Sequence, residues 1–315
     1  MGIGKTAAKT ALKLAENETI VTKTSDILGM LFPYAGLKKR ALDMYVSDIE
    51  NSDLPSESKL IAVLDAKRTV KKLRNQKNIA DIAVNNAKEG TDFTGQSKVD
   101  EDWLEKFMDA AGFVSSDKLQ LTWGKILSQE FETPGSTPPN MIRILSEITP
   151  ALAQAFKKIC SMKTIIVEMN NDGYITKAHH LIIVPYTNNN QRLYKTGLSF
   201  STINELETLG LIKFDPLNGY NVNGISENIE STVLVYSENK TDVITGHEKN
   251  KLPVGNIMLT PAGKCLQNIT PIEEISGYNE MVKQFMLDKK VKFMSQPCYK
   301  VLENEDKIQV IKCNS

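Results

Sequence analysis

The chain has 315 residues, 24% of them charged and 41% hydrophobic, which is typical of a globular protein. Lys and Arg together number 38, as do Asp and Glu, so no net charge draws the protein to nucleic acid or to a lipid surface. The four cysteines lack C-x-x-C spacing, which argues against a disulfide framework and a zinc site. With no signal-peptide pattern and no apolar run of spanning length, we expect a cytoplasmic protein without a transmembrane segment.

Two short motifs overlap at the start of the sequence. Gly4-Lys5-Thr6 matches the end of a phosphate-binding loop, but that loop needs a further upstream glycine and a preceding strand. Met1-Gly2 with Thr6 fits an N-myristoylation pattern, although a single acyl chain gives only marginal membrane attachment. We expect neither nucleotide binding nor acylation here.

The N-terminal part of the chain reads as a series of helices. Residues 7–17 and 37–49 have helical spacing of apolar residues, and Ser25-Asp26 marks another helix start before a turn at residues 32–34. Residues 56–88 contain neither Gly nor Pro, and predict one long helix, or two with a break near Asn75-Gln76. The apolar stripe of this segment consists of Leu60, Val63, Leu64, Val70, Leu73, Ala80, Ala83 and Ala87.

The rest of the chain changes character near residue 165. A polar linker is expected at residues 89–99. The further predicted helices are 100–111, 118–131, 141–148, 150–162, 201–209 (capped by Ser201 and ended by Gly210), 260–266 and 272–289. The predicted strands lie within 164–186, on both sides of an Asn-Asp-Gly turn, and at 231–237, 255–260 and 307–311.

These elements predict a mostly α N-terminal region followed by a smaller α+β domain of winged-helix type. Three regions are expected: an N-terminal helical region at 1–90, a helical domain at 91–165, and an α+β domain at 166–315.

Six basic residues lie within eleven positions of the long predicted helix. They are Lys67, Arg68, Lys71, Lys72, Arg74 and Lys77. Their ordinary interpretation is a solvated face that also pairs with acids. The alternative is a stripe that contacts nucleic-acid phosphates, although it lacks the aromatic residues that stack on single strands.

No catalytic or metal-binding constellation is visible. Of the three histidines, His179 and His180 are adjacent in a predicted strand and should point to opposite faces of the sheet. Neither an H-x-x-x-H pair nor a G-x-S-x-G elbow is present. Three acids at 100–102 suit a helix N-terminus for electrostatic reasons alone. We therefore expect a non-enzymatic protein with no metal and no cofactor.

The most specific stretch is a predicted helical hairpin at residues 100–136. Its apolar spacing predicts a core around the only two tryptophans of the chain. The residues that carry this signature are Trp103, Phe107, Leu119, Gln120, Trp123, Ile126, Leu127 and Glu130, with Pro134-Gly135-Ser136 behind them. The stretch resembles an uncharacterised bacterial domain family related to the abortive-infection alpha proteins of phage defence. It departs from that pattern at Gly124 and at Ser128-Gln129, and the resemblance implies no catalytic residue.

A second resemblance covers residues 203–266, which are similar to part of a winged-helix unit. A helix, the Gly210 stop, a turn at 215–219 and a returning strand at 255–259 match its order. The candidate recognition helix carries Glu205 and Glu207 but no basic residue, which is the wrong sign for contacting phosphates.

Three functions remain open. The favoured hypothesis is a non-enzymatic bacterial interaction or regulatory protein, in phage defence or abortive infection, that binds a protein partner or itself. The alternatives are a winged-helix DNA-binding regulator, and a toxin or enzyme whose site the sequence does not reveal.

Overall fold

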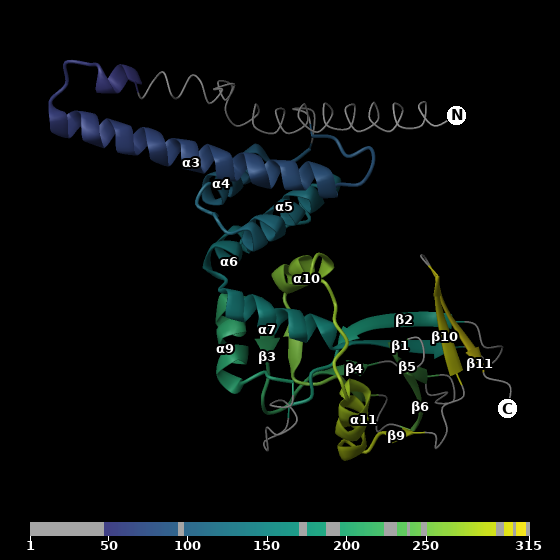
Figure 1. The fold of residues 1–315 in the computed structure, drawn as a ribbon. Coiled ribbons are helices and arrows are strands. Elements are labelled where there is room, and N and C mark those ends of the chain that lie inside the picture. The colour runs from purple at the N-terminus through teal and green to yellow at the C-terminus, as the bar shows by residue number, and fades with distance from the viewer. Residues whose placement is uncertain are drawn as a thin grey trace, which may run out of the picture. The chain divides into compact units, whose positions relative to one another are not determined.

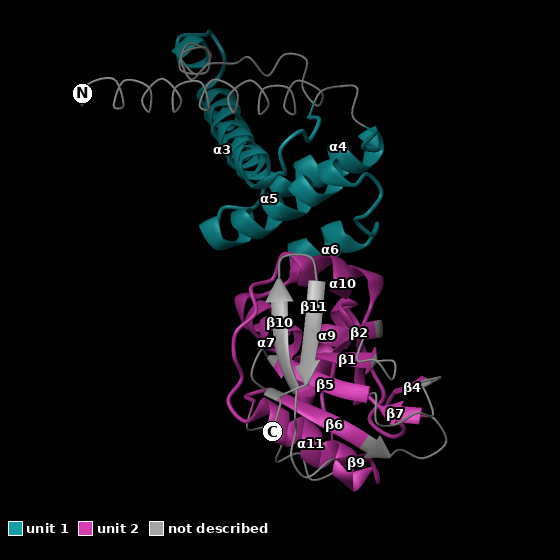
Figure 2. Ribbon diagram, turned by 90° about the vertical axis from the view of Figure 1, so that its right-hand side faces the viewer, with its two compact units in different colours: residues 1–146 teal, residues 147–315 magenta. Residues whose placement is uncertain are grey.

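The computed structural model describes residues 47–93, 98–169, 175–186, 196–223, 232–237, 240–246, 251–293, 299–304 and 307–312. The helices expected at 7–17 and after Ser25-Asp26 lie outside these ranges, as do Gly2 and the Gly4-Lys5-Thr6 motif. Of the helix expected at 37–49, only residues 47–49 are described, and they are helical. The chain divides into two compact units, residues 1–146 and 147–315 (Figure 2). A helical region followed by a region that contains a sheet is therefore confirmed.

Unit 1 is built on one long helix and a helical hairpin (Figure 1). Its helices are α3 (Ser56–Asn86), α4 (Glu101–Ala111), α5 (Asp117–Glu132) and α6 (Met141–Glu147), the last of which ends at the unit boundary. The helix α3 continues through Asn75-Gln76 without a break. Because α3 packs against both α4 and α5, the boundary expected near residue 90 separates elements that share one core.

The apolar stripe predicted along α3 is buried only in the second half of the helix. Ile79, Ala80 and Ala83 are fully buried. Leu60 and Leu64, which the sequence places on the same stripe, are 61% and 46% exposed. Periodicity identified an apolar face correctly at the end that meets the hairpin. Leu60 and Leu64 lie on the side of the helix opposite Ala80, where no described element covers them.

Two local features fix the hairpin. The Asp100 side chain accepts a hydrogen bond from the backbone N–H of Trp103 at 2.7 Å, which caps α4. Gly124 brings α5 close to α3, because a Cβ at this position would lie 2.4 Å from Cγ2 of Ile82. The glycine at this position therefore allows the close approach of these two helices.

Unit 2 contains α7 (Pro150–Ser161) and an antiparallel five-stranded sheet of order β2-β1-β5-β6-β9. These strands are β1 (Lys163–Met169), β2 (Ile175–Ile182), β5 (Thr232–Ser237), β6 (Lys240–Gly246) and β9 (Lys292–Phe293). A separate hairpin, β10 (Tyr299–Asn304) with β11 (Lys307–Lys312), contacts β6.

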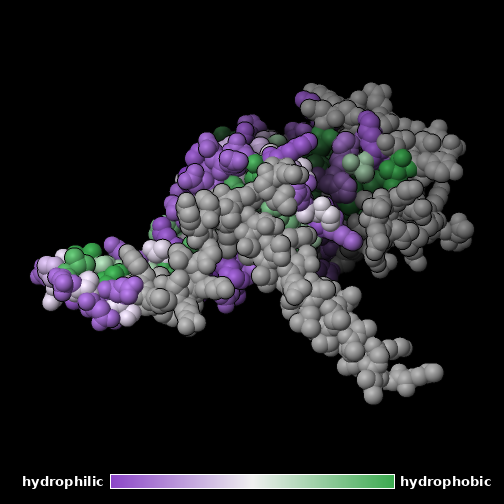
Figure 3. All heavy atoms as spheres, turned by 90° about the horizontal axis from the view of Figure 1, so that it is seen from above, coloured by the Kyte–Doolittle hydropathy of each residue, from purple (hydrophilic) through white to green (hydrophobic). Residues whose placement is uncertain are grey.

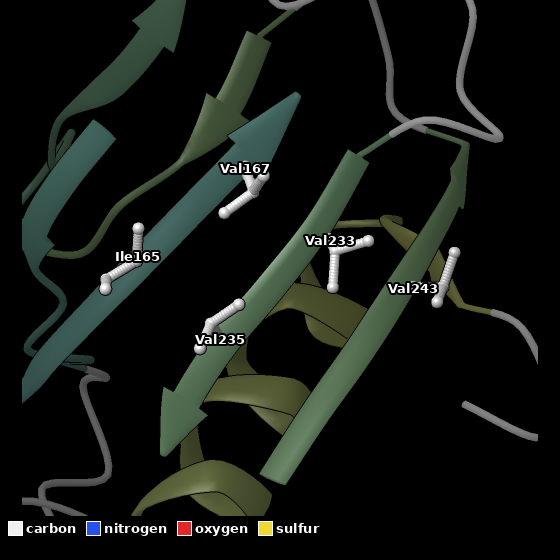
Figure 4. Close-up of a cluster of buried hydrophobic side chains, with 5 residues drawn as sticks. All are labelled: Ile165, Val167, Val233, Val235 and Val243. Carbon is white, nitrogen blue, oxygen red and sulfur yellow. The ribbon is translucent and has the colours of Figure 1, made fainter. Parts of the chain in front are cut away.

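The two faces of the sheet have different coverings. Figure 4 shows one face, which carries a buried cluster of Ile165, Val167, Val233, Val235 and Val243. On the other side, α11 (Tyr278–Asp288) crosses behind β5 and β6 (Figure 4).

Tyr278 anchors α11 to the sheet. Its hydroxyl oxygen lies 2.8 Å from Thr164 Oγ1 and 2.5 Å from the Met162 carbonyl oxygen. Burial raises the pKa of this phenol above its ordinary value, so the group stays neutral and serves as a structural hydrogen-bonding group.

A smaller substructure of unit 2 follows the order expected for residues 203–266. It contains α9 (Phe200–Leu209), β3 (Ile212–Phe214), β4 (Asn221–Asn223), β7 (Lys251–Pro253), β8 (Ile257–Leu259) and α10 (Pro261–Asn268). β3 pairs with β8, and β4 pairs with β7. Gly210 ends α9 with a φ of 93°, as predicted. The cap of α9 is Ser199, which accepts from Thr202 N–H at 3.1 Å, so the prediction of Ser201 was wrong by two residues.

Glycines hold this substructure together at two close approaches. At Gly263 a Cβ would lie 2.0 Å from the carbonyl oxygen of Leu211, so α10 can sit against the start of β3 only with a glycine here. At Gly255, whose φ is 91°, a Cβ would lie 2.5 Å from the carbonyl oxygen of Val184. The latter contact joins the substructure to the end of β2 through a parallel bridge between Val184 and Gly255.

Other boundaries differ from the sequence predictions. The helix expected at 272–289 begins only at Tyr278, after Gly277 with a φ of 72°. The strands β4, β6, β7, β9 and β10 were not predicted. Unit 2 begins at residue 147, so it includes α7 and is longer than unit 1, although a smaller second domain was expected.

Candidate functional site

The aromatic signature residues of unit 1 form a core. The rings of Trp103 and Phe107 are stacked with centroids 4.9 Å apart, and the rings of Phe107 and Trp123 are 4.8 Å apart. Phe107 and Trp123 are fully buried, as are Ile126 and Leu127. These apolar side chains stabilise the hairpin and present no group that could react.

The polar signature residues bind the backbone. Glu130 is buried, and its carboxylate accepts hydrogen bonds from the N–H groups of Gly135 at 2.5 Å and Thr137 at 2.9 Å. Gln120 is also buried and donates to the Val114 carbonyl oxygen at 2.8 Å. The glutamate thereby holds the loop that contains Pro134-Gly135-Ser136, which gives the signature a structural explanation.

Of the six basic residues on α3, three lie near acidic side chains of unit 1. Arg68 is 3.6 Å from Asp65, and Lys77 is 2.5 Å from Asp81. The Lys72 ammonium lies 3.3 Å from Asp109 and 4.1 Å from the ring centroid of Phe113, so Lys72 links α3 to the hairpin. The side chains of Lys67, Lys71 and Arg74 are exposed and have no ion-pair partner in the described ranges.

These three basic residues follow two exposed leucines, Leu60 and Leu64, along one side of the same helix. Positions 60, 64, 67, 71 and 74 follow the i, i+4, i+7 spacing that places residues on one side of a helix. We call this set, Leu60, Leu64, Lys67, Lys71 and Arg74, the α3 exposed face. It is about 21 Å long at 1.5 Å per residue. In Figure 3, apolar and hydrophilic atoms alternate at the end of the molecule where α3 begins.

The two adjacent histidines lie on opposite faces of the sheet, as predicted, because they are consecutive in β2. His179 Nε2 is 3.0 Å from Oε1 of Glu168, a buried carboxylate that also lies 4.0 Å from the Lys177 ammonium. His180 lines a pocket described below. Across the described ranges, no group of three or more His, Cys, Asp and Glu is placed to hold a metal ion.

A pocket lined by described residues lies within unit 2, with a volume of about 730 Å³. Its walls come from the start of β1, the edge strand β2, the strands β4 and β8, Val254 after β7, and α10 with the segment that follows it. The sequence did not reveal this pocket, because its residues are spread from Lys163 to Ile272 and no motif connects them.

None of the helices in the described ranges combines the length and apolar character needed to cross a membrane. The fold is thus a helical unit with an exposed mixed face, followed by an α+β unit with a pocket. The chain matches, over residues 65–283, a family described as a protein of unknown function, DUF2806. The match covers well over half of the sequence, so the protein belongs to this family. No curated protein and no solved structure matches the chain.

Proposed function

We propose that this protein is a non-enzymatic bacterial interaction protein of cytoplasmic phage defence, and that it acts by binding a partner protein through the α3 exposed face. The observation that carries the proposal is the exposure of Leu60 and Leu64, at 61% and 46%, on a helix whose second half packs against the hairpin through Ile79, Ala80 and Ala83. Contiguous apolar patches on a protein surface are typical of interaction sites. The phage-defence context rests on the resemblance of the Trp103–Ser136 stretch to abortive-infection proteins.

The chemistry of the α3 exposed face defines the partner. Two leucines are followed along one side of the helix by Lys67, Lys71 and Arg74, whose charges are unpaired in the described structure. A helix that carries an apolar stripe flanked by carboxylates would match this face along its length. We therefore expect an amphipathic acidic helix of another protein as the occupant.

A direct test of the defence role compares bacteria that carry this gene and its native neighbours with bacteria from which this gene alone is deleted. The proposal expects the efficiency of plating of at least one phage in a broad panel to rise by an order of magnitude on deletion. Equal plating of every phage on the two strains would contradict the defence role.

A second candidate, a DNA-binding regulator, is favoured by the three unpaired charges of the α3 exposed face. The sequence of α9 argues against its use as the DNA-binding helix, because the helix carries no basic residue that could contact phosphate. Of its two acids, Glu205 is exposed and Glu207 accepts a hydrogen bond from the Phe214 N–H. We therefore expect the winged-helix-like substructure of unit 2, from α9 to α10, to contact protein and not DNA.

Salt-dependent retention on duplex DNA separates the two candidates. If DNA is the partner, replacing Lys67, Lys71 and Arg74 by Glu abolishes retention. For the parent, the logarithm of the binding constant should fall against the logarithm of the salt concentration with a slope of about 3 from these contacts. Lys72 is left unchanged because it links α3 to the hairpin. Retention that is weak, or unaltered in the triple variant, excludes this use of the face.

A further inference from the structure

The lining of the unit 2 pocket contains basic residues and no acidic ones. Among the residues that line it are Lys163, at the start of β1, Lys264 on α10, and His180 on β2. Neither lysine ammonium has a hydrogen-bond or ion-pair partner among the described residues. None of the lining residues is Asp or Glu. Two ammonium groups without a carboxylate favour an anionic occupant.

The nearest acids on the Tyr220 side of the pocket do not cancel this charge. Asp215 and Glu207 raise the pKa of Tyr220, after the larger effect of its burial, so both lie close to it. Each carboxylate already accepts backbone donors: Asp215 from Leu217 and Asn218 at 3.0 and 2.9 Å, and Glu207 from Phe214 at 2.8 Å. Asp215 lies in the turn after β3 and Glu207 lies on α9, and neither is part of the pocket lining.

The remaining lining residues divide into hydrogen-bonding groups and an apolar wall. Asn221, Gln267 and Asn268 supply side-chain amides, and Ile182, Ile257 and Leu259 supply apolar surface. Pockets of roughly 300–1,000 Å³ with an apolar wall and a few polar groups are typical of small-molecule sites. The volume of about 730 Å³ lies inside this range.

We propose that this pocket binds a phosphorylated organic molecule of mononucleotide size. Lysine binds phosphate as a point charge. Two lysines match the double charge of a phosphate group better than they match the single charge of a carboxylate ligand. The amides add donors for the phosphate or for a sugar, and the apolar wall contacts the organic part. The site belongs to unit 2 and does not depend on the α3 exposed face, so it goes beyond the function proposed above.

Isothermal titration calorimetry on the full chain tests the proposal with four probes: inorganic phosphate, glucose 6-phosphate, adenosine 5′-monophosphate and adenosine. We expect saturable binding of one or both organic phosphates, tighter than that of phosphate alone and of adenosine. A preference for one of the two organic phosphates identifies the body of the ligand as a sugar or a nucleoside. The proposal is overturned if neither organic phosphate binds at millimolar concentration, or if adenosine binds as tightly as its phosphate.

Substitutions of pocket residues test whether the ligand binds in this pocket. Lys163→Gln and Lys264→Gln should each weaken binding by about tenfold, the effect of one lost charge-assisted hydrogen bond. Asn268→Glu places a carboxylate at the exposed rim and should weaken it similarly. Lys289→Gln, an exposed lysine at the end of α11 that is not part of the lining, is the matched control and should bind as the parent does. Circular dichroism checks that each variant is folded. Unchanged affinity in folded Lys264→Gln and Asn268→Glu contradicts the assignment of this pocket.

Discussion

Gln120 on α5 donates a hydrogen bond from Nε2 to the side-chain oxygen of Asn75 on α3, at 3.2 Å. Both side chains are buried, and both also bond to the turn that joins α4 and α5. Gln120 reaches the Val114 carbonyl oxygen and Asn75 reaches the Gly112 carbonyl oxygen, each at 2.8 Å. These two amides therefore connect three helices through groups that would be costly to bury alone.

Replacing Gln120 by Leu should lower the free energy of unfolding by about 1–3 kcal/mol, because the Asn75 side-chain oxygen and the Val114 carbonyl lose the amide that donates to them. Urea unfolding followed by circular dichroism measures the change. Lys118→Leu, at an exposed position of the same helix, is the matched control and should stay close to the parent. Equal stability of the two variants would show that the amide network contributes nothing.

Replacing Glu130 by Ala should cost about 2–3 kcal/mol, since the backbone N–H groups of Gly135 and Thr137 lose a charged acceptor. Hydrogen exchange offers a local readout, and the amides of these two residues should exchange faster in the variant. Glu105→Ala removes an exposed glutamate from α4 and controls for charge. Unaltered amide exchange rates at Gly135 and Thr137 would contradict this structural role of Glu130.

Gly124→Ala should destabilise unit 1 by about 1–3 kcal/mol, as expected for overpacking, because the new Cβ would lie 2.4 Å from Cγ2 of Ile82. In a second variant, Ile82→Ala added to Gly124→Ala, part of this loss should be recovered relative to the sum of the single changes. Additive effects would mean that the two positions do not meet. Thr122→Ala in the same helix serves as the control for thermal unfolding.

Cys160 is fully buried, and burial raises the pKa of its thiol from 9.0 to about 12. The folded chain holds this proton where the unfolded chain releases it. The free energy of unfolding should therefore fall as the pH rises from about 9 toward about 12, by up to about 1.4 kcal/mol per pH unit from this group. Urea titrations at several pH values should show a shallower fall for Cys160→Ala. Rapid alkylation of Cys160 by iodoacetamide in the native protein at pH 8 would contradict its burial.

Local signals in the sequence were enough to predict helices α3 to α6 and the opposite orientation of His179 and His180. Helix periodicity and caps at Asp100 and Thr260 act over a few residues, so they can be read from the chain directly. Periodicity shows which face of α3 is apolar, but it does not show what covers that face. The sequence alone therefore did not show that Leu60 and Leu64 are exposed.

Other features depended on contacts between distant positions. Gln120 meets Asn75 from 45 residues away, so its role as a buried bonding partner could not follow from spacing. Strand β6 contains Lys240, Thr241 and Asp242 and does not alternate like a half-buried strand, although pairing with β5 holds it in the sheet. The pocket joins β1 to α10 across about a hundred positions, and only the fold brings Lys163 and Lys264 to one cavity.

The most direct test of the central claim, that the α3 exposed face binds a protein partner, is a plating assay with the double variant Leu60→Glu/Leu64→Glu in the native gene context. The control is Leu217→Glu, which changes a leucine of unit 2 that is 86% exposed. We predict that the double variant loses protection from phage while its thermal unfolding temperature and abundance stay equal to those of the parent, and that the control protects fully. Full protection by the double variant would contradict the account, and so would a marked fall in its unfolding temperature, which would show that the chain itself covers this face.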